Sequence, residues 1–129
     1  MDVFSILTLG PAGSFSDQAA RYFARRLGIS ELDYANSNDE VVRRTLESLD
    51  RHMGVVPFET TGGGLVPEVV RELIVGLGKS PKLYGECVMS IVQCFAHKGD
   101  LSQVKRVVTH PQSILQCQNY LERLRMTHP

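Results

Sequence analysis

Short apolar runs alternate along the first half of the chain with stretches whose apolar residues recur every three or four positions. The runs are rich in residues that favour strands and predict β-strands at Phe4–Leu9, Leu32–Ala35 and Met53–Pro57. The helical spacing predicts two helices between these strands and a third helix after the last one. Strands that alternate with helices favour an α/β fold with a parallel-rich sheet and right-handed crossovers.

Capping and stop residues predict where these helices begin and end. The first is predicted from a cap at Ser16 to about Leu27, with Gly28 as its stop. The second opens with the capped, acidic turn Asn38–Glu40, and the third runs from Pro67 to about Leu77. The residues expected to face the core are Ala19, Ala20, Phe23 and Leu27, then Val42, Thr45, Leu46 and Leu49, then Val69, Val70, Leu73 and Ile74.

An aperiodic stretch at Gly76–Pro81 predicts a hinge before the second half of the chain. Beyond it, apolar and β-branched residues predict strands at Tyr84–His97 and Lys105–Thr109. One helical turn is expected between them, at Asp100–Val104. A last helix is predicted from Pro111 to about Arg125.

The hinge divides the chain into a first lobe at about residues 1–78 and a partial second lobe at about residues 79–129. The second lobe would have only two strands and one long helix, which leaves strand edges and apolar surface open. Open edges invite pairing with another chain, so we expect self-association, as a homodimer or a larger assembly.

Polar or glycine-rich breaks follow three of the predicted strands. They are Gly10–Ser16, Phe58–Gly64 and the junction at Thr109 and His110. Ligands of open α/β sheets bind beyond the carboxyl ends of the strands. The sequence therefore predicts that the three breaks share one cleft.

The junction at Thr109 and His110 carries the clearest chemical pattern. Pro111 suits the first position of a helix, where free backbone N–H groups attract anions. Gln112 and Gln116 lie four residues apart, so their side chains share one helix face. This cluster predicts a site for an anionic substrate, and the His110 imidazole is suited to proton transfer near neutral pH.

The other two breaks permit two interpretations each. Ser14 and Asp17 have the spacing of a capping box, which indicates either a well-capped turn or a carboxylate docked on the helix N-terminus. The glycines at 62–64 indicate a flexible loop or a close approach of the backbone to a ligand. Glu59 is a candidate general acid or a partner for a backbone N–H group.

Three segments together resemble the motifs of prephenate dehydratases, in order and spacing. The first is Gly10-Pro-Ala-Gly-Ser-Phe-Ser-Asp-Gln-Ala-Ala20, and the second is Gly54-Val-Val-Pro-Phe-Glu59 followed by Gly64. The third is Thr109-His-Pro-Gln-Ser-Ile-Leu-Gln-Cys117. The resemblance covers essentially the whole chain.

The resemblance implies a bilobal, type II periplasmic-binding-protein-like α/β fold. It also implies the removal of water and carbon dioxide from prephenate to give phenylpyruvate, on the route to phenylalanine. This chemistry needs no metal or cofactor. The resemblance assigns catalysis to Glu59, Thr60, Thr61 and Thr109, and substrate binding to Gly13, Ser14, Phe15, His110, Gln112 and Gln116.

Two departures from the family pattern keep alternatives open. Glu59-Thr60-Thr61 stands where the family has Glu-Asn-Ser or Glu-Asn-Thr, and the family's Thr-Arg-Phe motif does not occur in these 129 residues. A catalytically inactive fragment that binds a small molecule is one alternative. A prephenate decarboxylase that does not form the aromatic product is another.

The composition argues against several classes of function and predicts a cellular location. The formal net charge is zero, with 14 basic and 14 acidic residues, which argues against a nucleic-acid-binding surface. The three cysteines and the missing signal-peptide pattern predict a reducing compartment, with the cytoplasm as the default. No apolar run approaches the length of a membrane span. The histidines and cysteines lack the spacing of a metal site.

Overall fold

The computed structural model describes residues 4–48, 50–79 and 81–127. The chain divides into two units. The first contains Met1–Thr60 and Leu65–Met89, and the second contains Thr61–Gly64 and Ser90–Pro129. This division lies further along the chain than the lobe boundary predicted near residue 78.

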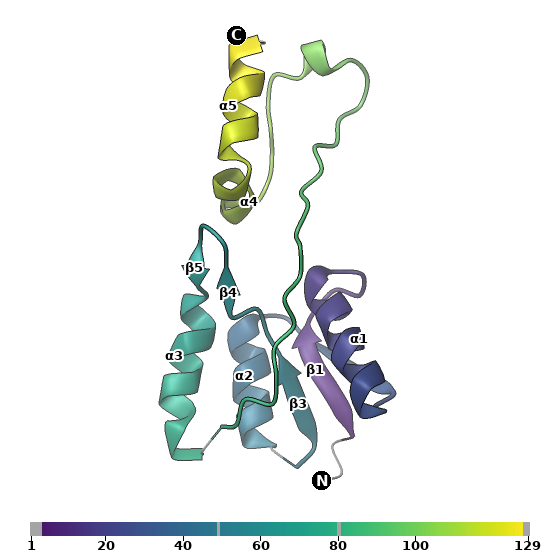
Figure 1. The fold of residues 1–129 in the computed structure, drawn as a ribbon, viewed down its shortest axis with the longest axis vertical. Helices are drawn as coiled ribbons and strands as arrows, with labels where there is room; N and C mark the ends of the chain where they lie inside the picture. The colour runs from purple at the N-terminus through teal and green to yellow at the C-terminus, as the bar shows by residue number, and fades with distance from the viewer. Residues whose placement is uncertain (1–3, 49, 80, 128–129) are drawn as a thin grey trace. The chain divides into compact units, whose positions relative to one another are not determined.

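A three-stranded parallel sheet forms the centre of the first unit (Figure 1). Its strands are β1 (Ser5–Leu9), β2 (Glu31–Ala35) and β3 (His52–Val55), in the order β2-β1-β3. Residue Ile6 of β1 is aligned with Leu32 of β2 and with Met53 of β3. The three strands and the parallel sheet predicted for this half are therefore confirmed.

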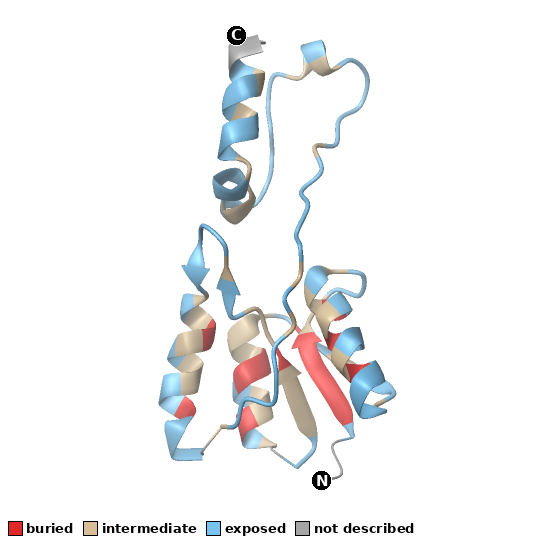
Figure 2. Ribbon diagram, viewed as in Figure 1, coloured by how far each residue is buried: buried red, intermediate tan, exposed pale blue. Residues whose placement is uncertain are grey.

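Two helices cover opposite faces of that sheet because the side chains of β1 alternate between the faces. Ile6 packs with Ala20 and Ala24 of α1 (Phe15–Leu27). Leu7 packs with Val41 of α2 (Asn38–Glu47). Both faces of β1 are buried (Figure 2), which explains why its sequence, Ser-Ile-Leu-Thr-Leu, lacks the regular alternation of apolar and polar residues found in a strand with one exposed face.

A third helix, α3 (Pro67–Val75), packs on α2 and continues into the 3₁₀ helix η1 (Gly76–Lys79). Val69 and Leu73 face Val42 and Leu46 of α2, as the spacing predicted. The prediction that Ile74 points inward was wrong, because its side chain is 61% exposed.

Other predicted core positions differ as well. Leu27, at the last turn of α1, is half exposed instead of buried. Val41 is fully buried, although it was not among the residues of α2 predicted to face the core. Leu49 lies outside the described residues.

Two glycines let the helices of the first unit approach their neighbours closely. A Cβ atom at Gly54 in β3 would lie 2.5 Å from the Thr45 hydroxyl oxygen on α2. A Cβ atom at Gly76 would collide with the side chain of Leu46. Glycine at both positions therefore permits the packing of α2 on β3 and of η1 on α2.

The glycine-rich break after β3 forms a short hairpin that the sequence did not predict. Its strands are β4 (Glu59–Thr60) and β5 (Gly64–Leu65), which pair across a turn. Gly62 and Gly64 have φ values of +86° and +71°, a region that favours glycine. The turn geometry thus explains these two glycines without a ligand.

Among the described residues that follow α3 and η1 the chain contains no strand, so two predicted strands were wrong. Tyr84–His97 and Lys105–Thr109 have no regular secondary structure. The single turn predicted at Asp100–Val104 is confirmed as the 3₁₀ helix η2 (Leu101–Gln103). Side chains along the two segments are mostly exposed (Figure 2), including Val88, which is 90% exposed.

The last predicted helix is divided into two. Helix α4 (Pro111–Gln116) is followed by the capping residue Cys117, after which α5 (Gln118–Thr127) begins. Pro111 lies in the first turn of α4, as predicted. The helical spacing of apolar residues continues through Cys117. Such spacing shows that the apolar side chains share one face, but two consecutive helices can satisfy it as well as one unbroken helix.

Candidate functional site

The best-defined candidate site is the loop that joins β1 to α1. The strand ends at Leu9, and the Gly10–Pro11 peptide bond is cis. Gly13 has a φ of +85°, a conformation that other residues rarely adopt. Ser14 then caps α1, because its Oγ accepts a hydrogen bond from the Asp17 N–H at 3.2 Å. The predicted cap at Ser16 was therefore wrong by two residues.

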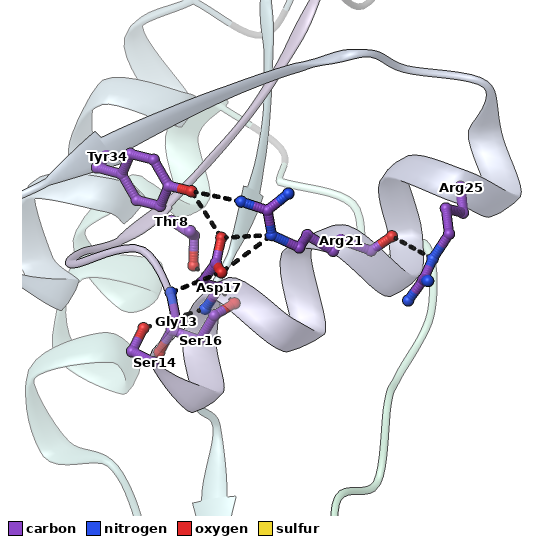
Figure 3. Close-up of polar contacts among 8 residues, drawn as sticks. All are labelled: Thr8, Gly13, Ser14, Ser16, Asp17, Arg21, Arg25 and Tyr34. Atoms are coloured by element: carbon purple, nitrogen blue, oxygen red, sulfur yellow. Dashed lines mark hydrogen bonds and ion pairs between the residues drawn. The ribbon is translucent and has the colours of Figure 1, made fainter.

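A buried carboxylate holds this loop in place (Figure 3). Asp17 is 2% exposed, and its Oδ2 accepts a hydrogen bond from the Gly13 N–H at 2.8 Å. The Tyr34 hydroxyl of β2 donates to Oδ1 at 2.6 Å. The Arg21 Nε, one helical turn away, donates to both oxygens at 3.1 and 3.0 Å. The carboxylate therefore connects the loop, the helix and the neighbouring strand.

These contacts shift the pKa values of the three side chains. The Tyr34 hydroxyl, the Gly13 N–H and the Arg21 guanidinium lower the Asp17 pKa to about 2, since each favours the charged form. The same carboxylate raises the pKa of Arg21 and that of Tyr34. Asp17 is therefore ionised throughout the physiological pH range.

Two backbone donors remain for a ligand at the start of α1. The N–H groups of Phe15 and Ser16 make no hydrogen bond within the described part of the chain, as expected for the first helical residues. Phe15 is also partly exposed. The positive end of the helix dipole makes such donors suitable for an anion.

The neighbouring helix uses the same capping arrangement. Ser37 caps α2 by accepting from the Glu40 N–H at 3.4 Å, and the Glu40 carboxylate accepts from the Asn36 N–H at 3.0 Å. That backbone contact lowers the Glu40 pKa. In both caps the acidic side chain bonds the residue before the serine, whereas the usual capping box bonds the cap residue itself.

The predicted catalytic residues of the second motif lie on the hairpin. Glu59 and Thr60 form β4, where Glu59 is exposed and Thr60 is half-buried. Thr61 is exposed in the turn that follows.

The residues of the third motif all belong to the second unit. Thr109 is exposed, and His110 caps α4 through its Nδ1, which accepts from the Gln112 N–H at 3.2 Å. Gln116 accepts a hydrogen bond from the Gln93 side chain at 3.0 Å. The structure thus joins His110 to Gln112 and gives Gln116 a partner on the preceding extended segment. The shared cleft and the pairing of Gln116 with Thr109 stay predictions.

A second polar cluster joins the three strands of the sheet through Ser5 of β1, Asp33 of β2 and His52 of β3. The Ser5 hydroxyl donates to Asp33 at 2.7 Å and lies 2.8 Å from the His52 Nδ1. Because its proton points to Asp33, the hydroxyl accepts from His52, so Nδ1 carries the hydrogen. Ser5 is 3% exposed, and His52 faces both partners with one nitrogen. This arrangement differs from a Ser-His-Asp nucleophile system and indicates a structural role.

Other features of the described residues add little to the site. No group of three or more histidine, cysteine or acidic side chains there is suited to hold a metal ion. None of the helices in the described segments is long and apolar enough to cross a membrane. One shallow apolar groove lies beside α3, and none of the predicted site residues lines it. Its lining residues are Leu65, Pro67, Val70, Arg71, Ile74 and Val75.

The sequence interpretation missed most of the network that holds the loop. The spacing of Ser14 and Asp17 signalled the cap, but it did not indicate that the carboxylate bonds Gly13. No role in the site was predicted for Arg21, and Tyr34 was predicted only as part of the strand Leu32–Ala35. Their convergence depends on the pairing of β1 with β2, for which a single sequence carries no local signal.

Comparisons with known proteins agree on one family. A family model described as prephenate dehydratase matches residues 6–128. The bifunctional chorismate mutase/prephenate dehydratase of Escherichia coli (strain K12) is 32% identical over 120 residues, which cover 92% of this chain and 30% of that protein. The prephenate dehydratase of Methanocaldococcus jannaschii is 31% identical over 115 residues, covering 88% of this chain and 40% of that protein.

The prephenate dehydratase of Amycolatopsis methanolica is 28% identical over 121 residues, which cover 91% of this chain and 37% of that protein. The chain therefore spans between 30% and 40% of the length of these curated relatives. No solved structure matches the chain significantly.

Proposed function

Because the chain belongs to the prephenate dehydratase family, we propose that it binds prephenate and forms part of the machinery that converts prephenate to phenylpyruvate. One observation carries this proposal: the family model matches residues 6–128, nearly the whole chain. The loop between β1 and α1 supports it, since the free N–H groups of Phe15 and Ser16 are suited to a carboxylate. Prephenate carries two carboxylates.

The chemistry gives the candidate residues distinct roles. The departing hydroxyl needs a proton donor, for which we propose Glu59. The Glu59 side chain is exposed, and this role requires that its carboxyl group contact the bound substrate. The hydroxyls of Thr60, Thr61 and Thr109 are proposed hydrogen-bonding partners at the reacting ring.

The remaining predicted residues are proposed to hold the substrate. Gly13 and Ser14 shape the first loop, while His110, Gln112 and Gln116 supply imidazole and amide groups from the third motif. A site made of amides, hydroxyls and helix N–H groups has no strong cation that would over-stabilise the departing carboxylate.

Calorimetry with prephenate tests the substrate directly. The chain should bind prephenate more tightly than chorismate, which differs in the position of its side chain. Gln116→Ala should weaken prephenate binding by roughly 1.5–3 kcal/mol, the usual value of a hydrogen bond to a charged group. Gln118→Ala is the matched control, since the Gln118 amide donates to Glu122 on its own helix. A folded protein that shows no heat of binding with prephenate would refute the proposal.

A second candidate function is binding without dehydration. Thr60 stands where the resemblance places an amide, and these 129 residues contain no Thr-Arg-Phe sequence. We therefore expect phenylpyruvate absorbance to stay near background for this chain alone. Release of carbon dioxide without that absorbance would instead identify a decarboxylase that forms no aromatic product.

The overall architecture, the cellular location and the assembly state are also proposed. The bilobal, type II periplasmic-binding-protein-like architecture is an inference from the family, with lobes at about residues 1–78 and 79–129. A cytoplasmic location is the expected setting for amino-acid biosynthesis. A homodimer is the proposed assembly state.

A further inference from the structure

The Asp17 carboxylate poses an electrostatic problem for the proposed site. It is buried in the first turn of α1, next to the N–H groups proposed to receive a carboxylate of prephenate. Two like charges at such short range repel each other, and the repulsion is strongest where water is excluded. Left unbalanced, Asp17 would weaken the binding of an anion at this helix end.

Arg21 supplies the balancing charge. Its Nε bonds both Asp17 oxygens, and its Nη2 lies 3.4 Å from the Tyr34 hydroxyl oxygen. Half of the Arg21 side chain stays exposed, but the one N–H of its Nε is directed to Asp17. Arg21 and Asp17 together are close to neutral, which leaves the helix dipole and its free N–H groups to attract an anion.

We propose that Arg21 is a positioning residue of the prephenate site: it neutralises Asp17, and so keeps the Phe15 and Ser16 N–H groups available to an anionic substrate. The inference rests on the proposed function, because the anion in question is a prephenate carboxylate. It extends that function to a residue outside the predicted site.

Charge-changing variants separate this role from a general effect of basic residues. Arg21→Gln should weaken prephenate binding roughly tenfold at low salt, because it leaves the Asp17 charge unbalanced. Arg25→Gln is the matched control. It removes the same charge from the same helix, but Arg25 donates to the Arg21 carbonyl oxygen and lies roughly 12 Å along the axis from Asp17. Its effect should be less than twofold.

A double variant distinguishes neutralisation from direct contact with the substrate. If Arg21 acts by neutralising Asp17, then Asp17→Asn combined with Arg21→Gln removes both charges and should restore affinity to within about threefold of the parent protein. If Arg21 itself binds the substrate, the double variant stays as weak as Arg21→Gln. That result, or equal affinities of the Arg21→Gln and Arg25→Gln proteins, would overturn the inference.

Salt provides a readout that a purely structural role would not change. The difference between Arg21→Gln and the parent protein should shrink as ionic strength rises from about 0.01 to 0.5 M, because salt screens the exposed part of the interaction. Circular dichroism should show that each variant is folded. A loss of affinity that is independent of salt would contradict the electrostatic role.

An NMR titration tests the network without any ligand. The Asp17 carboxyl carbon should titrate at a higher pH in Arg21→Gln than in the parent protein, because a contact that favours the charged form is gone. Identical titration curves would overturn the inference even if prephenate binds. Absence of prephenate binding by the parent protein would instead refute the proposed function, and the two failures are therefore distinguishable.

Discussion

Asp17 shows how one side chain links sequence, stability and the proposed site. Its carboxylate accepts hydrogen bonds from the Tyr34 hydroxyl, the Gly13 N–H and the Arg21 guanidinium, and its pKa falls to about 2. A pKa lower in the folded than in the unfolded state means that the ionised form stabilises the fold. The contribution is therefore complete above the unfolded pKa of about 3.8 and is lost as the pH falls towards 2.

Asp17→Asn tests that linkage. At pH 7 the variant should be less stable by about 1.5–3 kcal/mol, the range for hydrogen bonds to a charged group. The difference between the two proteins should then shrink between about pH 4 and pH 2, where Asp17 of the parent protein becomes protonated. Urea unfolding followed by circular dichroism at several pH values measures this. A difference that is constant across that range would contradict the assigned pKa.

The start of α1 provides a comparison at the scale of a secondary-structure element. Ser14 and Ser16 both have the right chemistry for a cap, but only Ser14 accepts the Asp17 N–H. Ser14→Ala should destabilise the fold by about 0.5–2 kcal/mol. Ser16→Ala should change it by less than about 0.5 kcal/mol, because the described contact of Ser16 uses its backbone carbonyl. Equal effects in thermal unfolding would show that the cap is assigned to the wrong serine.

The contact between α2 and β3 gives a second test at this scale. Gly54→Ala should destabilise the protein by about 1–3 kcal/mol, because the new methyl group meets the Thr45 hydroxyl. Thr45→Ala in the same chain should recover most of that loss by making room. Gly78→Ala is the control, since no atom lies within 4 Å of the added Cβ. A neutral Gly54→Ala, measured by urea unfolding, would argue against the close packing.

The arrangement of secondary-structure elements also explains why the strands predicted after residue 79 were wrong. Tyr84–His97 and Lys105–Thr109 have the β-branched and apolar residues of strands, and those residues were the basis of the prediction. A strand also needs a neighbouring strand to which its backbone can hydrogen-bond, and neither segment pairs with another strand among the described residues. Side-chain preference can therefore be correct while the strand is not formed.

For the whole molecule, the exposed apolar residues of these segments predict self-association. Val88, Val92 and Val108 are 90%, 74% and 87% exposed, on described backbone that pairs with no strand. Exposed apolar patches and open strand edges favour contact with another chain. Light scattering at micromolar concentration should therefore report a mass above that of a monomer.

A double variant and a control variant locate the surface through which the chains associate. Val92→Lys combined with Val108→Lys should shift the protein towards the monomer, since two charges would face the contact. Val75→Lys on α3 replaces a side chain of similar exposure outside these segments and should leave the mass unchanged. A stable monomer in the parent protein would refute self-association. An effect confined to Val75→Lys would move the contact to α3.

The sequence by itself determined the parts of this protein that depend on neighbouring residues. Apolar periodicity and the signals at Gly28 and Pro67 located the three strands and three helices of the first unit, and the ordered motifs indicated the family. Only the tertiary structure decided which serine caps α1 and which residues hold the loop. Arg21 and Tyr34 meet at Asp17 because β1 pairs with β2, and pairing between distant segments leaves no local signal in one sequence.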